Sequence, residues 1–516
     1  MNKGAVGRGE EKEKEKENGK EKEPRLSVNL AENVDTIKRA FSYPVNRALV
    51  VRELFAASLQ REVTVLFLEG ATDTESIESQ IIQPLVTKTL TLLRHHNAVT
   101  VTMEEILTSS SVRTTSLFQD LIHGLVNGGT ILLIQGEAQG LTMDTPGFQS
   151  RSITEPQVEH VLKGPKEAFI ESAAANRSLI RKQVRDHQLM SEVVTVGERS
   201  MNEVSLMYIK NLADPDLVTE VKQRISEIQA DTVPNLSMLE QHIEERSYSL
   251  IPTALLTERP DRASSFLMEG HVILIMENSP TAMVVPITFW SLFHTPEDQY
   301  LRWAYGNFIR IVRIFAVFVA LLTPSLYIAV STFHEEMLPT DLLLAIGATR
   351  ERVPFPALIE VLLMEAAFEL VREAAVRIPT IIGPTIGIVG ALILGQAAVE
   401  ANIVSPILVI IVAMTGISSF TIPEISFNFA VRILRFIILF TASFMGFFGI
   451  ALTLTCVISY MVSFKSFGVP FLTPLSPHDR SSKDLIVRPP VWKQWLRPFY
   501  TNPQDKQRKK KPEGPS

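Results

Sequence analysis

The stretch FIRIVRIFAVFVALLTPSLYIAVSTF, residues 308–333, carries no charged side chain from Ile314 to its end. About 20 apolar residues are enough for a helix to cross the hydrocarbon core of a bilayer. Three further runs are comparably apolar, at 381–399, 403–422 and 436–464. Because a soluble protein would have to bury all four runs, we interpret the chain as an integral membrane protein. The predicted fold is an α/β cytoplasmic region of two small lobes, followed by an α-helical polytopic membrane domain over 301–465.

Basic residues beside the apolar runs predict which side of the membrane each end occupies. Arg302, Arg310 and Arg313 precede the first run, and the C-terminal region carries the basic stretch QDKQRKKKPE at 504–513. We therefore expect the N-terminal and C-terminal regions to be cytoplasmic, which requires an even number of crossings.

Four crossings satisfy that condition, but Arg432 and Arg435 would then lie on the outer side. If the charged stretch 356–379 also crosses, the count stays even only when 436–464 is a hairpin at Gly446 and Gly449. The sequence leaves both alternatives open.

The region before the first apolar run has the pattern of an α/β protein. Short β-branched runs typical of strands occupy 62–70, 129–136, 203–211 and 270–278, with helical patterns between them. The predicted segments are a disordered charged tail (1–25), lobe 1 (26–147), a helical connector (148–200), lobe 2 (201–300) and a cytoplasmic C-terminal tail (466–516).

Composition disfavours several functions. Acidic residues slightly outnumber basic ones, 56 against 50, so the overall charge does not predict nucleic-acid binding. Cys456 is the single cysteine, which excludes an intramolecular disulfide and a paired-thiolate metal site. The glycines of 125–140 lack the spacing and lysine of a phosphate-binding loop, and the ten histidines do not cluster. We predict no enzymatic activity, no cofactor and no metal site.

The stretch PALIEVLLMEAAFELVREAAVRIP, residues 356–379, is apolar yet carries six charges. On a helix, Glu365, Glu369 and Glu373 are successive i,i+4 neighbours in one sector with Arg372. Arg372 and Arg377 can each neutralise one of these carboxylates. A charge facing lipid is costly, so this face must contact water, a protein interior or a pore.

Two interpretations of this helix remain open. It is either an amphipathic helix in the membrane interface or a helix whose copies surround a hydrated path, where carboxylates favour monovalent cations. In the second case an apolar constriction at Leu362 closes the path by dewetting. The candidate pore-lining residues are Leu358, Leu362, Glu365, Glu369, Arg372 and Glu373.

The stretch GPKEAFIESAAANRSLIRKQV, residues 164–184, is predicted to be a helix rich in charged residues. It is either a solvated surface helix or a surface on which subunits or lobes dock. The candidate coupling residues are Lys166, Glu167, Glu171, Asn176, Arg177 and Arg181.

Four collinear stretches resemble the A subunit of GerA-family spore germinant receptors, and the resemblance runs from about residue 30 to 480. They lie at 164–184, 257–290, 333–373 and 394–423. The resemblance implies a protein of the inner spore membrane that acts with a transporter-like B subunit and a lipoprotein C subunit. It also implies a homo-oligomer, with a pentamer as the expected size, that forms a nutrient-gated cation channel lined by the segment matching 353–378.

Two alternatives to a channel subunit are kept. The chain is a non-conducting scaffold, or it is a transporter component of the same receptor complex. A secondary transporter usually has more spans and an internal repeat, neither of which this sequence displays.

Overall fold

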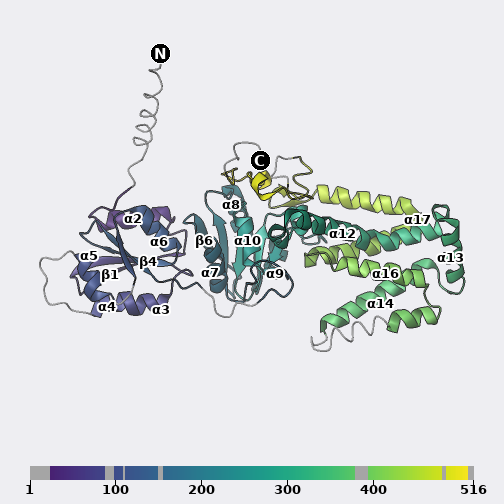
Figure 1. Ribbon diagram of the computed structural model, residues 1–516, viewed down its shortest axis with the longest axis horizontal. Helices are drawn as coiled ribbons and strands as arrows, with labels where there is room; N and C mark the ends of the chain where they lie inside the picture. The colour runs from purple at the N-terminus through teal and green to yellow at the C-terminus, as the bar shows by residue number, and fades with distance from the viewer. Residues whose placement is uncertain are drawn as a thin grey trace, which may run out of the picture. The chain divides into compact units, whose positions relative to one another are not determined.

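The computed structural model describes residues 24–87, 98–107, 111–148, 155–377, 393–478 and 484–509. The predicted disordered tail lies outside the described residues up to residue 23, and so do residues 381–392 of the predicted span at 381–399. The chain forms two compact units (Figure 1). The first comprises Met1–His160, Pro165–Ile243 and Leu256–Val284, and the second comprises Val161–Gly164, Glu244–Leu255 and Val285–Ser516.

Lobe 1 contains an antiparallel five-stranded sheet in the order β1-β2-β4-β5-β3. Its strands are β1 (Leu49–Ala56), β2 (Arg61–Leu68), β3 (Val112–Thr115), β4 (Gly129–Ile134) and β5 (Gly140–Asp144). The helices around it are α2 (Leu30–Ala40), α3 (Thr74–Ile77), η1 (Glu78–Ile82), α4 (Gln83–Thr87), α5 (Ala98–Val101), η2 (Thr102–Ile106) and α6 (Phe118–Val126).

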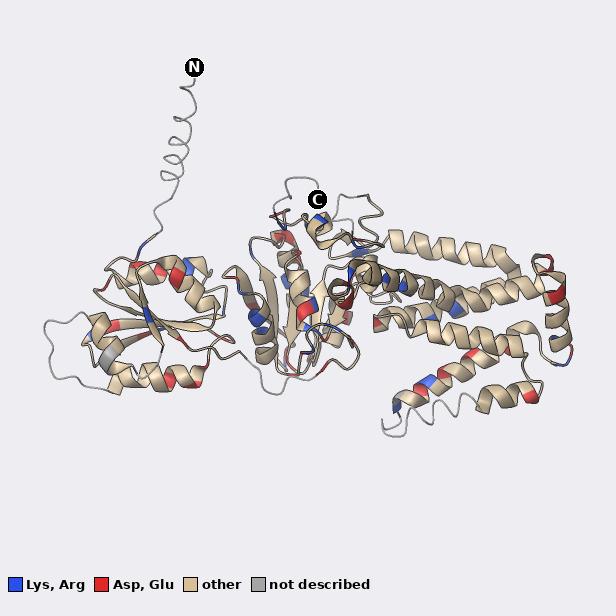
Figure 2. Ribbon diagram, viewed as in Figure 1, with Lys and Arg blue, Asp and Glu red and all other residues tan. Residues whose placement is uncertain are grey.

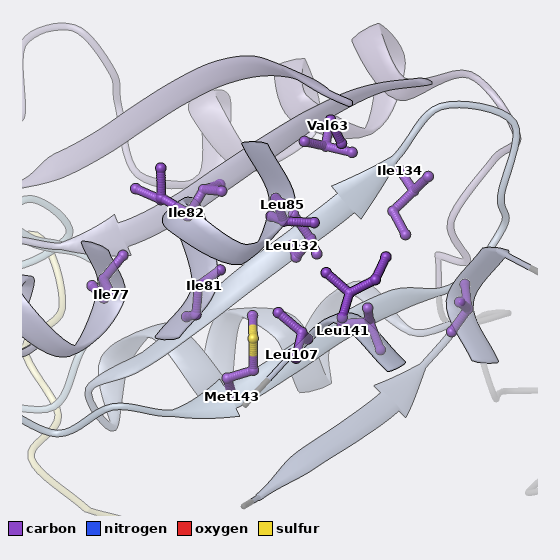
Figure 3. Packing of buried hydrophobic residues seen from close by; sticks show 14 of the residues in the cluster. Val63, Ile77, Ile81, Ile82, Leu85, Leu107, Leu132, Ile134, Leu141 and Met143 are labelled. Atoms are coloured by element: carbon purple, nitrogen blue, oxygen red, sulfur yellow. The ribbon is translucent and has the colours of Figure 1, made fainter. Parts of the chain in front are cut away.

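Both faces of this sheet are buried, which explains why its central strands are continuously apolar. Successive side chains of a strand point to opposite faces. Val63 and Val65 of β2 therefore join one core with α3, η1 and α4. Figure 3 shows Val63 in this core. Leu66 and Leu68 join the core beneath α2 and α6. The strands predicted at 62–70 and 129–136 are confirmed as β2 and β4.

Lobe 2 contains a second five-stranded sheet in the order β6-β7-β9-β10-β8. Its strands are β6 (Leu189–Val196), β7 (Asn202–Ile209), β8 (Leu255–Thr257), β9 (Val272–Met276) and β10 (Ala282–Val285). Its helices are α7 (Ala173–Gln183), α8 (Pro215–Ser226), α9 (Leu236–Ile243) and α10 (Pro260–Leu267). The predictions at 203–211 and 270–278 are confirmed as β7 and β9.

The segment predicted as a helical connector, 148–200, differs from the structure in two respects. Strand β6 lies inside it, because LMSEVVTV pairs along its whole length with β7. Within 164–184 the helix begins only at Ala173. The residues before it stay extended because the Asn176 side chain hydrogen-bonds both the N–H and the C=O of Ile170, at 2.8 and 2.6 Å.

Two helices of the described residues are long and apolar enough to cross a membrane, α12 (Trp303–Thr332) and α17 (Ile425–Val462). The third apolar helix, α16 (Pro406–Ser419), has 14 residues and is shorter than the span predicted at 403–422. Along the chain, α13 (Thr340–Arg350) and the charged helix α14 (Ala357–Arg377) lie between α12 and α16. The α/β region followed by a helical membrane region confirms the predicted fold class.

Helix α17 is a hairpin of two helices rather than one rod (Figure 1). At Gly446 the backbone has φ 57° and ψ −135°, outside the helical region. The hydroxyls of Thr441 and Thr453 are 2.8 Å apart, although 12 residues of continuous helix would separate them by about 18 Å. The two halves approach so closely that a Cβ on Gly449 would lie 2.2 Å from the Thr441 carbonyl oxygen.

The two ends of the hairpin meet at one aromatic cluster. Phe427, near the start of α17, contacts Phe289 with ring centroids 5.7 Å apart. Phe464, just after its end, contacts Phe471 at 5.9 Å, and Phe471 contacts Phe289 at 6.1 Å. The hairpin considered from the sequence for 436–464 is therefore present, with its turn at Gly446.

Candidate functional site

The charges of α14 are distributed along its length (Figure 2), but its carboxylates lie in different environments. Glu360 and Glu365 have side chains 1% exposed, and that of Glu369 is 19% exposed. Glu373 is 63% exposed and pairs with Arg377, Nη2 to Oε1 at 2.7 Å, as the i,i+4 spacing predicts.

Two arginines of α17 hold the buried carboxylates. Arg435 Nη2 is 2.8 Å from Glu365 Oε2 and 2.9 Å from Glu369 Oε1. Arg432 also pairs with Glu369 through Nη2, and its Nε lies 3.1 Å from Oε1. Both carboxylates therefore face the interior of this chain, one of the environments that the cost of charge in lipid permits.

Arg372 fixes α14 to the end of α16. Its Nη2 donates to Ser419 Oγ at 2.7 Å, and its guanidinium lies between the rings of Phe368 and Phe420, 4.9 and 5.0 Å from their centroids. Such cation–π contacts are strong where water is excluded. Arg372 also approaches Glu369 at 3.6 Å, one of the pairings expected from the sequence.

This cluster is incompletely hydrogen-bonded. Neither carboxylate oxygen of Glu365 has a hydrogen bond of ordinary geometry, and Arg435 Nε has none among the described residues. Two carboxylates against three arginines give the cluster a net charge of +1. Buried, partly satisfied charges of this kind are costly. Movement of α14 would therefore separate these charges from their partners on α16 and α17.

The apolar members of the predicted pore-lining set also pack inside the chain. Leu358 and Leu362 are half-buried against a core that includes Val361, Tyr327 and Leu408. The exposed residues of α14 up to Glu373 lie on another side of the helix: Ile359, Leu363, Ala366, Leu370 and Glu373. In this conformation the predicted lining residues other than Glu373 thus turn toward α12, α16 and α17.

Glu360 lies apart from the acidic sector, as expected. It joins the N-terminal end of α14 to the start of α16. Its Oε2 accepts from the backbone N–H of Ser405 at 3.1 Å, at the N-cap of α16. Arg350 Nε lies 3.7 Å from its other oxygen. A carboxylate at a helix N-terminus is favoured by the helix dipole. Glu360 is therefore a packing residue of the helical region.

The residues predicted from 164–184 lie at the junction of the two lobes. Arg177 donates to Ser205 Oγ of lobe 2 at 3.1 Å and lies 3.7 Å from Glu69 of lobe 1. Next to it, a Cβ on Gly70 would meet Ser178 Cα at 3.5 Å. Arg181 is buried and donates to the Leu189 carbonyl at 3.4 Å.

The other members of that set fix the strand-like residues before α7. Glu167 pairs with Lys182, and Lys166 with Glu155 at 3.3 Å. Glu171 is exposed, and its carbonyl accepts from the Asn278 N–H at 2.8 Å. Burial, and secondarily the nearby charge of Arg177, lower the pKa of Arg181 to about 10. Among these residues, Arg177 joins the two lobes within the chain through Glu69, and contact between subunits stays a prediction.

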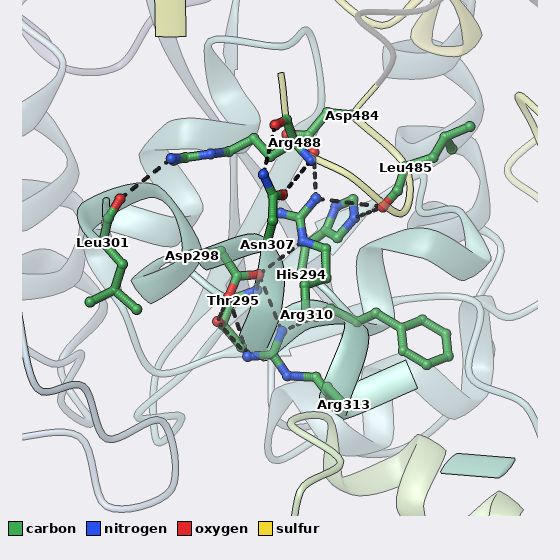
Figure 4. A network of polar contacts seen from close by, with 11 residues as sticks. His294, Thr295, Asp298, Leu301, Asn307, Arg310, Arg313, Asp484, Leu485 and Arg488 are labelled. Atoms are coloured by element: carbon green, nitrogen blue, oxygen red, sulfur yellow. Dashed lines mark hydrogen bonds and ion pairs between the residues drawn. The ribbon is translucent and has the colours of Figure 1, made fainter. Parts of the chain in front are cut away.

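A second buried charge network lies at the start of α12 (Figure 4). Asp298 lies within the short helix α11 (Glu297–Tyr300), and its side chain is buried, 1% exposed. Arg310 Nε and Arg313 Nη1 reach its Oδ2 at 3.3 and 3.2 Å. Although burial alone would raise the pKa of Asp298, Arg313 and Arg310 hold it below its ordinary value.

The C-terminal region contacts the same network through Asp484 and Leu485. Arg310 pairs with Asp484 at 2.5 Å, and His294 Nε2 donates to the Leu485 carbonyl at 2.8 Å. Burial and then Arg310 lower the pKa of His294 to about 4, so the ring is neutral at pH 7. Two of the three arginines used above to orient the chain are thus buried in ion pairs.

Arg432 and Arg435 were not predicted as partners of the acidic helix. One sequence feature could have identified them. Two arginines three residues apart in an otherwise apolar helix need a counter-charge. Asp298 and Asp484 were not predicted either, and their partner Arg310 is 12 and 174 residues away from them in the sequence.

Comparison with known proteins covers nearly the whole chain. The family described as Bacillus/Clostridium GerA spore germination protein matches residues 35–500. Spore germination protein KA of Bacillus subtilis is 35% identical over 498 residues, 96% of this chain and 91% of its own length. The uncharacterized membrane protein YfkQ of the same organism is 38% identical, over 84% of each chain.

One solved structure covers 52% of this chain. It is the N-terminal domain of the A subunit of the Bacillus megaterium spore germinant receptor GerK3, of which 98% is matched. The identity is 25% and the TM-score is 0.42.

Proposed function

Since this chain belongs to the GerA family of spore germination proteins, as the A subunit of a germinant receptor, we propose that it oligomerises into a nutrient-gated channel for monovalent cations. The observation that carries the proposal is the pair of carboxylates, Glu365 and Glu369, held by counter-charges inside a membrane region. Ionisable side chains at membrane depth are costly, which supports a functional role for this pair.

In the proposed mechanism, the structure corresponds to the closed state. Arg435 and Arg432 pair with the carboxylates of Glu365 and Glu369. The uncovered side of α14 presents Ile359, Leu363 and Leu370, together with Glu373, whose charge is paired with Arg377. Opening requires α14 to move away from α17, so that the carboxylates face water in a path between neighbouring copies. Carboxylates along a pore raise the local cation concentration.

We propose for this chain the assembly that its resemblance to the family implies. A homo-oligomer, with a pentamer as the expected size, would surround the path with one α14 from each copy, and the receptor's B and C subunits would supply the nutrient signal and its transmission. The hairpin of α17 supports the same side for both ends of the membrane region, because its two ends meet at Phe289. We propose that this side is the cytoplasmic face of the inner spore membrane.

A non-conducting scaffold is the second candidate, and one observation favours it. The network at Glu365 and Glu369 lies inside the single chain and ties α14 to α17 without any neighbouring copy. In that case the charges only fix the fold of the membrane region.

Potassium release from spores separates the two candidates. The test variants are Glu365→Gln and Glu369→Gln, expressed with the B and C subunits in spores that lack the native receptor. The matched control is Glu335→Gln in the exposed segment before α13. If the chain is a channel subunit, we expect the two test variants to alter potassium release at equal receptor abundance, and the control variant to leave it unchanged. Unchanged release with intact assembly in both test variants would leave the scaffold as the function.

A further inference from the structure

Residues 484–509 form a folded segment attached to the first turns of α12, which we name the C-terminal clip. Arg488 N donates to Asn307 Oδ1 at 2.7 Å, and Asn307 Nδ2 donates back to the Arg488 carbonyl at 3.1 Å. Trp303 Nε1 donates to the same carbonyl at 2.6 Å. Figure 4 shows Arg488 and Asn307 beside the Asp484–Arg310 pair. The clip is thereby held at the beginning of a helix long and apolar enough to cross a membrane.

Beyond Arg488 the clip has a defined fold. Arg508 N donates to the Trp495 carbonyl at 2.9 Å, and Arg497 N donates to the Lys506 carbonyl at 3.0 Å. Arg497 Nη1 also pairs with Asp505 at 3.0 Å. These contacts close a loop, so residues 495–508 have a defined backbone arrangement of their own.

That surface combines apolar tips with positive charge. Val491 is 59% exposed and Trp492 is 55% exposed, next to the exposed Lys493. The exposed basic residues of the returning half are Lys506, Arg508 and Lys509. Residues 491–509 hold five basic residues and one acidic residue, a net charge of +4.

The first residues of α12 also expose aromatic side chains. Trp303, Tyr305 and Phe308 are 47%, 52% and 61% exposed. Tryptophan and tyrosine concentrate where a membrane helix passes the lipid headgroups, because their rings are apolar with a polar edge. Trp303 is hydrogen-bonded to the Arg488 carbonyl of the clip, and Trp492 follows Arg488 closely along the chain.

We propose that the C-terminal clip binds the anionic lipid surface of the membrane, with Trp492 among the headgroups and the exposed lysines and Arg508 on lipid phosphates. Basic residues beside a membrane helix are attracted to anionic lipid within about a Debye length of the surface, and neutral lipid lacks this attraction. The clip would thereby fix the Asp484–Arg310 pair and the start of α12 to the membrane plane. This role does not depend on whether the chain conducts ions.

The test places a fluorophore at the proposed contact. The full chain carries Cys456→Ala and Trp492→Cys, is labelled at residue 492 with bimane, and is reconstituted in phosphatidylcholine nanodiscs with or without phosphatidylglycerol. Spin-labelled lipid serves as the quencher. We expect severalfold stronger quenching with phosphatidylglycerol, and loss of that difference at about 1 M salt, where the Debye length falls to about 3 Å.

A charge-removing variant and a matched control complete the design. Lys493→Gln combined with Lys506→Gln and Arg508→Gln should abolish the phosphatidylglycerol effect, whereas Arg113→Gln combined with Arg199→Gln, both exposed in the first unit, should preserve it. Hydrogen exchange at the Arg508 amide verifies that the clip stays folded in each variant. Equal quenching in both lipids with a folded clip would overturn the proposal, and protection of residue 492 only when the B and C subunits are added would assign the surface to a protein partner instead.

Discussion

Arg435 Nη2 lies 2.8 Å from Glu365 Oε2, and both side chains are 1% exposed. The pair joins α17 to α14 and is therefore a contact between the helical hairpin and the acidic helix. Replacing one member leaves the other charged and buried, whereas replacing both with apolar residues removes the charge altogether. This asymmetry makes the pair a direct test of how α14 is held.

Arg435→Leu should destabilise the membrane region by about 3–5 kcal/mol, because Glu365 loses its counter-charge in a buried site. The double variant with Glu365→Leu should recover much of this loss. The measurement is the thermal unfolding midpoint of the full chain in detergent, compared across the double-mutant cycle. Arg377→Leu, which removes an exposed ion pair at the end of the same helix, serves as the control and should cost less than about 1 kcal/mol. Additive effects of the two leucine substitutions would show that the pair does not couple the helices.

Leu362→Ala should favour opening if α14 lines the conducting path. Leu362 packs into the core shared by α12, α14 and α16, and losing this contact costs the closed arrangement about 1–2 kcal/mol, which shifts the equilibrium roughly five- to thirtyfold. The measurement is germination and potassium release without nutrient. Leu344→Ala, at a 67% exposed position of α13, is the control. Receptors that assemble with Leu362→Ala and stay tightly closed would contradict the pore assignment.

The α/β region could be predicted because its signals are local. Val63, Val65, Leu66 and Leu68 lie in one short run whose burial on both sheet faces follows from its uniform apolarity. The carboxylates of α14 could also be identified, since their spacing defines a helical sector. Their partners could not, because Arg435 lies 70 residues from Glu365 and the choice of partner depends on how the helices pack.

The helix predicted over 164–184 is shorter in the structure than its local composition indicates. Its composition favours a helix throughout, yet one buried amide, Asn176, holds Ile170 in an extended conformation and delays the helix to Ala173. Hydrogen bonds from side chain to backbone compete with helix formation, and composition does not reveal which of them will form.

Gly446→Ala should disrupt the hairpin of α17. The φ of 57° combined with ψ of −135° is a conformation that residues with a Cβ rarely adopt, and the added Cβ would lie 3.0 Å from Phe333 Cβ. The expected cost is about 1–3 kcal/mol or more. Gly347→Ala is the matched control, because its Cβ would meet nothing within 4 Å inside helix α13, where alanine is the better helix former. The measurement is the yield and unfolding midpoint of the full chain, and equal values for the two variants would contradict a required turn at Gly446.

Acid should loosen the C-terminal clip through His294. Its pKa in the folded chain is lowered to about 4, from an ordinary value of about 6.5, by burial and by Arg310, while Asp298 and Asp484 oppose the shift. Because the unfolded segment takes up the proton more readily, the stabilisation is complete above about pH 6.5 and declines by about 1–3 kcal/mol as the pH falls toward 4. The protection factor of the Arg488 amide, which donates to Asn307, should therefore fall over this range once the pH dependence of intrinsic exchange is divided out. His294→Gln should remove that part of the fall in protection, and His123→Gln, at an exposed position of lobe 1, should leave the fall unchanged. The same acid response in both variants would mean that another group controls the clip.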